Sequence, residues 1–190
     1  MPDFQSRKFT AAIQKYMDFE RLIASSIQEI CGPYCTVCSG LCCREEICRE
    51  SLDSIWLRMV RTLNGHDVGK YSDSEGWLTN QGCALETGRP PICYEFTCTR
   101  VLEEFEGSPL KIITEDLGNL INLVGKNIHG RNHLVTLTTK QELQRINLDK
   151  LIKALDTYSS IAVNYKNSLR ELLVDERVHG GNEGRILWKI

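Results

Sequence analysis

The sequence predicts a mainly α-helical protein, a helical bundle that carries an irregular cysteine-rich region. Apolar residues recur at steps of three and four before residue 31 and after residue 110, as in amphipathic helices. The length of 190 residues, with 42% hydrophobic and 25% charged residues, fits one compact domain. We expect a single domain over 1–190, made of an N-terminal helix (1–30), a cysteine-rich region (31–100), C-terminal helices (101–175) and a tail (176–190).

The composition excludes several classes of partner. A formal charge of −2 shows no basic excess, so we expect no nucleic acid and no anionic membrane as partner. No run approaches the roughly 18 apolar residues of a membrane span, and residues 1–10 lack the apolar core of a secretory signal. We therefore expect a cytoplasmic protein.

The first predicted helix begins near Pro2 and Asp3 and ends at Gly32 and Pro33, which commonly stop helices. Its apolar stripe spans about seven turns and is interpreted as core. The stripe consists of Phe9, Ile13, Tyr16, Met17, Ile23, Ile27 and Ile30.

A second helix is predicted from Ser51, as N-cap, to Asn64-Gly65. Its apolar side consists of Ile55, Trp56, Met59, Val60 and Leu63. Residues 66–80, rich in Gly, Ser and Asp, are typical of a surface loop, which could cover the cysteine-rich region.

The C-terminal half predicts a short helix over 101–105, a turn at 107–109 and a helix over about 110–128. The buried side of that helix is expected to hold Ile113, Leu117, Leu120, Ile121 and Val124. Residues 129–133 are expected to be a loop and 134–137 a short strand or extended chain. The last helix, over about 148–174, repeats Leu151, Leu155, Tyr158, Tyr165, Leu169 and Leu172 before a polar stretch at Gly180-Gly181.

Eight of the nine cysteines lie in two blocks between residues 35 and 98. Thiolates bind soft metals, and in a reducing compartment a cysteine-rich segment is more often metal-binding than bridged. We therefore favour metal ligation over disulfides or redox thiols. The predicted ligands are Cys35, Cys38, Cys42, Cys43, Cys48, Cys83, Cys93 and Cys98.

The spacing of these cysteines leaves the kind of centre open. Cys35-x2-Cys38 can wrap one ion, whereas the adjacent side chains of Cys42 and Cys43 diverge and do not easily share one. The eight thiols form either two four-ligand sites or one four-ligand cluster with four supporting thiols. Zinc and an iron–sulfur cluster both fit, and three close-spaced cysteines with remote partners slightly favour the cluster.

Four thiolates on one zinc ion leave a net charge of −2, which nearby donors must offset. Arg44, Arg49, Arg89 and Arg100 flank the cysteines, and Arg89, fixed beside Pro90-Pro91, is the predicted second-shell donor to sulfur. His66 is interpreted as a solvated loop residue rather than a ligand. His129 and His133 are separated by Gly130, which argues against a helical metal pair.

The motif Cys35-x2-Cys38-x3-Cys42-Cys43, then Gly82-Cys83 and Arg89-Pro90-x2-Cys93-x4-Cys98, resembles the C-x2-C-x3-CC family of zinc- or iron-chelating domains. The resemblance covers roughly residues 35–100. Family members are mostly small bacterial proteins, and flagellin lysine-N-methylases carry a similar cysteine region. The resemblance thus implies a metal-binding protein, with an iron–sulfur cluster and methyl transfer as possible additions.

Cys31 is expected to lie outside the ligand set. Cys31-x3-Cys35-x2-Cys38 has the spacing of the radical S-adenosylmethionine cluster motif, but that motif follows a strand of an α/β barrel. This chain is too short and too helical to form such a barrel.

Three functional classes follow. We favour a metal- or cluster-binding protein without catalysis, acting in metal handling, electron transfer or interaction with a protein partner, because no catalytic set can be placed near the cysteines. The alternatives are an iron–sulfur-dependent protein lysine methyltransferase and a structural zinc module that presents the C-terminal helices to a partner.

Overall fold

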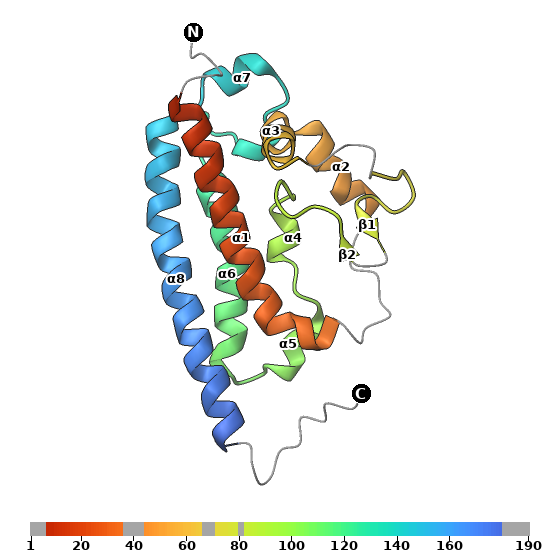
Figure 1. Cartoon of the computed structure of the whole chain (residues 1–190), viewed down its shortest axis with the longest axis vertical. Coiled ribbons are helices and arrows are strands. Elements are labelled where there is room, and N and C mark those ends of the chain that lie inside the picture. The colour runs from red at the N-terminus through yellow and green to blue at the C-terminus, as the bar shows by residue number, and fades with distance from the viewer. Residues whose placement is uncertain (1–6, 36–43, 66–70, 80–81, 180–190) are drawn as a thin grey trace.

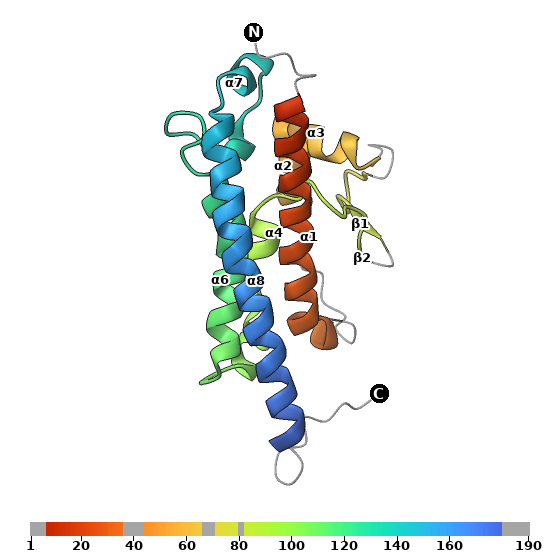
Figure 2. The same cartoon turned by 60° about the vertical axis from the view of Figure 1, so that its left-hand side comes forward.

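The computed structural model describes residues 7–35, 44–65, 71–79 and 82–179, with side chains up to residue 173. Three long helices form its body: α1 (Arg7–Cys35), α6 (Pro109–Gly125) and α8 (Leu148–His179). Each of the three packs against the other two, and Figures 1 and 2 show them running side by side along the long axis. The prediction of a mainly helical protein is confirmed.

Shorter elements surround this body. They are α2 (Glu45–Asp53), α3 (Ile55–Leu63), β1 (Leu78–Thr79), β2 (Gly82–Cys83), α4 (Ile92–Glu95), α5 (Thr99–Glu104), the 3-10 helix η2 (Leu134–Thr136) and α7 (Lys140–Gln144). β1 and β2 form an antiparallel pair in the register Leu78 to Cys83 and Thr79 to Gly82. In Figures 1 and 2, α2 and this hairpin lie on the side of α1 away from α8.

The described residues form two hydrophobic cores. The large one lies between the long helices and α3, and includes Trp56, against which Phe9 and Tyr16 pack edge-on. The small one consists of Cys48, Trp77 and Leu85, with Leu52, Tyr71 and Cys83 packed around it. The part of the cysteine-rich region around Cys48 and Cys83 therefore has a separate core with few members, whereas Cys31 and Cys98 pack in or against the large core.

The predicted C-terminal helices are present. α6 starts at Pro109 behind the N-cap Ser108, and the five apolar residues expected on its inner side are all buried. α8 begins at Leu148 as expected and continues five residues past Val174, to His179. Leu151, Leu155 and Leu169 are buried, while Tyr158, Tyr165 and Leu172 pack at the edge of the core. None of the described helices has the combination of length and apolarity that crossing a bilayer requires.

The predicted end of the first helix is wrong. α1 passes through Gly32 and Pro33 and ends at Cys35. Pro33 lacks the N–H of one backbone hydrogen bond, but Ile30 and Cys31 are buried in the core at this end and stabilise the last turns of α1. Cys35 thus belongs to a helix end. The predicted start at Pro2 and Asp3 lies outside the described residues.

The predicted cap of the second helix is also wrong. Ser54 caps α3, and its Oγ accepts a hydrogen bond from Leu57 N at 3.2 Å. Ser51 lies inside α2. The sequence pattern did not predict this helix, because only Cys48 and Ser51 are buried in it. A helix without an apolar stripe gives no periodic signal.

The segment from Tyr71 to Thr79 is more ordered than the predicted surface loop. It contains β1, and its Trp77 is only 1% exposed. Residues 66–70, with His66, and residue 80 lie outside the described part. Residues 129–133 are a loop, as predicted. Residues 134–136 form the 3-10 helix η2 rather than a strand, and α4 and α7 were not predicted.

Candidate metal centre

Five of the eight predicted ligands lie in the described residues. Cys35 is the last residue of α1, Cys48 lies in α2, Cys83 in β2, Cys93 in α4, and Cys98 is the N-cap of α5. Cys38, Cys42 and Cys43 lie outside the described residues. The five described cysteines therefore come from five elements spread over 64 residues of sequence.

Cys48 and Cys83 form the first group, in the small core with Trp77 and Leu85. Cys48 is only 6% exposed. Gly76, at φ 62°, lies directly over it: a Cβ there would stand 2.6 Å from both Cβ and Sγ of Cys48. The turn before β1 can therefore cover Cys48 only because residue 76 is glycine.

Trp77 fixes this group to the neighbouring helices. Its Nε1 donates to Ser51 Oγ at 2.6 Å, and the buried guanidinium of Arg61 lies 4.8 Å from the ring centroid. Arg61 Nη2 also donates to the backbone oxygen of Ser51 at 3.1 Å. A cation–π contact and two hydrogen bonds therefore hold Trp77, α2 and α3 together.

Cys31, Cys35 and Cys98 form the second group. Cys31 is 7% exposed, and burial, followed by the neighbouring Cys35 and Cys98, raises the pKa of its thiol to about 12. The end of α1 and the start of α5 thus place Cys35 and Cys98 each close enough to affect Cys31. Cys31, expected outside the ligand set, lies one helical turn before Cys35.

Arg89 lies between the cysteine segments. Its Nε donates to Leu85 O at 2.6 Å. Burial lowers the pKa of this guanidinium, but Tyr94, Cys83, Cys93 and Glu20 outweigh it and raise the pKa overall. By contrast, Arg49, another candidate, forms an ion pair with Glu45 at 2.7 Å. That Arg89 donates a hydrogen bond to a metal-bound sulfur remains a prediction.

Glu20 is the residue that sequence reasoning missed. It is fully buried in α1, and its carboxylate accepts hydrogen bonds from Gly88 N at 2.8 Å, Arg89 N at 3.2 Å and Tyr94 Oη at 2.9 Å. It therefore holds the turn that carries Arg89 and the helix that carries Cys93. The sequence contained a signal, because position 20 falls at helical spacing between Tyr16 and Ile23 of the apolar stripe.

Burial raises the pKa of Glu20 to about 7, and the three hydrogen bonds and Arg89 only partly offset it. A buried carboxyl costs less free energy when such donors surround it. Tyr94 shares this environment, since burial and then Glu20 raise the pKa of its hydroxyl well above 10.

Within the described ranges, no three His, Cys, Asp or Glu side chains are placed to hold a metal ion together. The described thiols instead form the two groups, with Cys93 near Arg89. In sequence, the other three predicted ligands, Cys38, Cys42 and Cys43, lie between Cys35 of one group and Cys48 of the other.

His133 takes part in local hydrogen bonds. Its ring accepts from Val135 N at the start of η2, and its Nε2 lies 2.9 Å from Asn122 O.

No protein-family model matches the chain, and neither do the curated proteins or the solved structures that were compared with it.

Proposed function

We propose that this protein holds a zinc or iron–sulfur centre through Cys35, Cys38, Cys42, Cys43, Cys48, Cys83, Cys93 and Cys98. Its role would be metal handling, electron transfer or interaction with a protein partner. The observation that carries the proposal is the grouping of the described cysteines. Cys35 and Cys98 both lie near Cys31, and Cys48 packs with Cys83, although Cys35 and Cys98, like Cys48 and Cys83, are more than 30 residues apart in sequence.

The charge around these cysteines supports the same proposal. A four-thiolate site with zinc or an oxidised four-iron cluster carries a net negative charge, which a buried guanidinium can offset. Cys83 and Cys93 both act electrostatically on Arg89, and Glu20 holds the Arg89 backbone in place. Arg89 is thus positioned to stabilise bound thiolates.

The small core suggests that the centre also contributes to folding. Cys48, Trp77 and Leu85 are its only fully buried members within the described ranges. So few apolar side chains give limited stabilisation, and small metal-binding domains commonly obtain the rest from ligand–metal bonds. Metal bound by both cysteine blocks would close the chain between them, so its binding free energy would become folding free energy.

Serine variants test this proposal. Cys42→Ser and Cys93→Ser should each lose metal and become sensitive to protease between residues 35 and 98, because each removes one thiolate from the centre. Metal content and limited proteolysis are the measurements, with Cys31→Ser as the matched control. Full metal content in both variants would show that the ligand assignment is wrong.

A further inference from the structure

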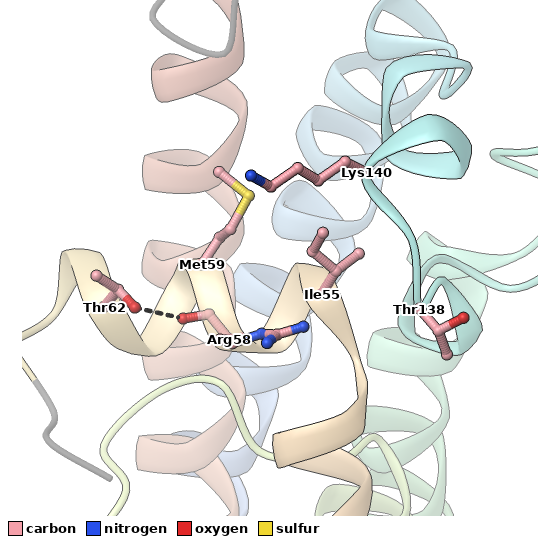
Figure 3. Close-up of a pocket in the computed structure, with 6 residues that line it drawn as sticks. All are labelled: Ile55, Arg58, Met59, Thr62, Thr138 and Lys140. Atoms are coloured by element: carbon pink, nitrogen blue, oxygen red, sulfur yellow. Dashed lines mark hydrogen bonds between the residues drawn. The ribbon is translucent and has the colours of Figure 1, made fainter.

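A separate cavity lies between α3 and the start of α7, and no cysteine lines it. Its volume is about 560 Å³, within the range of small-molecule sites. Figure 3 shows its lining residues, which are Ile55, Arg58, Met59, Thr62, Thr138 and Lys140. The cavity is unrelated to the proposed metal centre in its residues and in its chemistry.

Backbone hydrogen bonds and caps fix both walls of this cavity. Ile55 N donates to Leu137 O at 2.8 Å, which joins the start of α3 to the segment before α7. On the other wall, Thr139 and Glu142 form a capping box that sets the direction of α7 from Lys140 onward. Because both walls are tied, the cavity exists before any ligand binds.

Two cations reach this cavity from opposite walls, Arg58 from α3 and Lys140 from α7. Among residues 7–35, 44–65, 71–79 and 82–173, no carboxylate forms an ion pair with either of them. The acid nearest to Lys140 in sequence, Glu142, is engaged elsewhere: its Oε2 accepts from Thr138 N, Thr139 N and Thr139 Oγ1. The cavity therefore has a positive charge without an internal counter-ion.

Two apolar side chains, Ile55 and Met59, line the cavity beside these cations. Ile55 is 8% exposed, Met59 is half-buried, and Figure 3 shows Lys140 extending toward the Met59 thioether. A purely inorganic anion would leave this apolar surface in contact with water, and a neutral apolar molecule would leave both cations unpaired. Only a ligand with both properties complements the whole lining.

We propose that this cavity binds a small amphipathic anion. The anionic head would pair with Arg58 and Lys140, and the apolar body would cover Ile55 and Met59. A carboxylate on a short alkyl chain is the simplest member of this class.

Hexanoate tests the proposal, with hexanol as the apolar control and acetate as the anionic control. We expect hexanoate to shift the methyl NMR signals of Ile55 and Met59 in a saturable way, and to bind about tenfold more tightly than either control. Arg58→Gln and Lys140→Gln should each weaken hexanoate binding about tenfold, because each removes one charged partner of the head. Lys153→Gln, at an exposed lysine of α8, should leave it unchanged.

Arg58 and Lys140 are both exposed, so their variants should fold normally, and the spectra of the free proteins check this directly. Equal binding of hexanoate and hexanol would overturn the assignment of a charged head. Hexanoate binding that both glutamine variants retain, or no shift at Ile55 and Met59, would overturn the site itself.

Discussion

Glu20 shows how one residue connects the bundle to the cysteine region. It lies on the inner side of α1, yet its partners are Gly88, Arg89 and Tyr94, about 70 residues later. Burial of a carboxyl normally costs several kcal/mol unless donors surround it. The residue is thus placed where it can fix the Arg89 turn, and its protonation affects folding.

The first prediction concerns the pH dependence of stability. The pKa of Glu20 rises from 4.5 to about 7 on folding, so the folded protein binds this proton more tightly than the unfolded chain. Its contribution to stability is fully present below pH 4.5 and is lost as the pH rises to about 7, by on the order of 3 kcal/mol. Glu20→Gln should remove this loss.

Chemical denaturation between pH 5 and 8 measures how the free energy of unfolding changes with pH in the wild type and in Glu20→Gln. Glu29→Gln, on the same helix but in an ion pair with Lys166, is the control and should keep the wild-type profile. If Glu20→Gln loses stability over this range as steeply as the wild type, Glu20 is not the group responsible.

The second prediction concerns Cys31, which lies near Cys35 and Cys98. If the eight other cysteines complete the centre, Cys31→Ser should leave metal content unchanged. It should alter the free energy of unfolding by no more than about 1 kcal/mol, the scale of an average substitution. Loss of iron and sulfide from this variant, with both retained in Cys83→Ser, would instead make Cys31 a ligand of a radical-type cluster.

At the scale of elements, the contact between α4 and α6 positions Cys93. A Cβ at Gly118 of α6 would lie 2.4 Å from Tyr94 O and 2.9 Å from Glu95 Cα, so the backbones meet without an intervening side chain. Position 118 is buried, and α4 has only four residues. So short a helix depends on this packing for its position.

The third prediction follows from that contact. Gly118→Ala should force α4 away from α6 and lower the free energy of unfolding by about 1–3 kcal/mol, the usual cost of overpacking. Denaturant unfolding measures the change. Asn119→Ala, at the exposed neighbouring position, should have little effect or stabilise α6 slightly. A Gly118→Ala protein as stable as the wild type would show that α4 moves freely relative to α6.

The helices differ in how well the sequence predicts them. α6 and α8 have long apolar stripes, and helical periodicity found both. α2 and α4 could not be found in this way, because short helices held by a small core or by a neighbouring backbone show no period. Gly32-Pro33 was wrongly taken as a stop, since the buried Ile30 and Cys31 stabilise the last turns of α1. Likewise, spacing predicts the eight cysteines as one ligand set but could not show that the described ones divide into two groups.

At the scale of the whole molecule, the helical bundle serves as a support for the cysteine region. The large core holds α1, α6 and α8 together, and described cysteine segments are attached to it at separate points. These points include the end of α1 at Cys35, the Glu20 contact with residues 88–94, and the packing of α4 on α6. The bundle should therefore retain its helices when the cysteine region loosens.

The fourth prediction tests this independence. Removal of metal with a chelator should increase hydrogen exchange in residues 71–98, whereas α6 and α8 should keep their protection. The measurement is hydrogen exchange by mass spectrometry, with and without chelator. Uniform loss of protection across α6 and α8 would show that the bundle depends on the centre as well.

The central claim is that the cysteines hold a metal centre, and metal analysis of the anaerobically purified protein tests it most directly. We expect zinc, or iron with acid-labile sulfide and a visible absorption band, in stoichiometric amounts. A colourless protein with zinc and no sulfide would select zinc over the cluster. Protein that contains neither metal, and that takes up neither zinc nor iron and sulfide after reduction of its thiols, would show that these cysteines hold no metal centre.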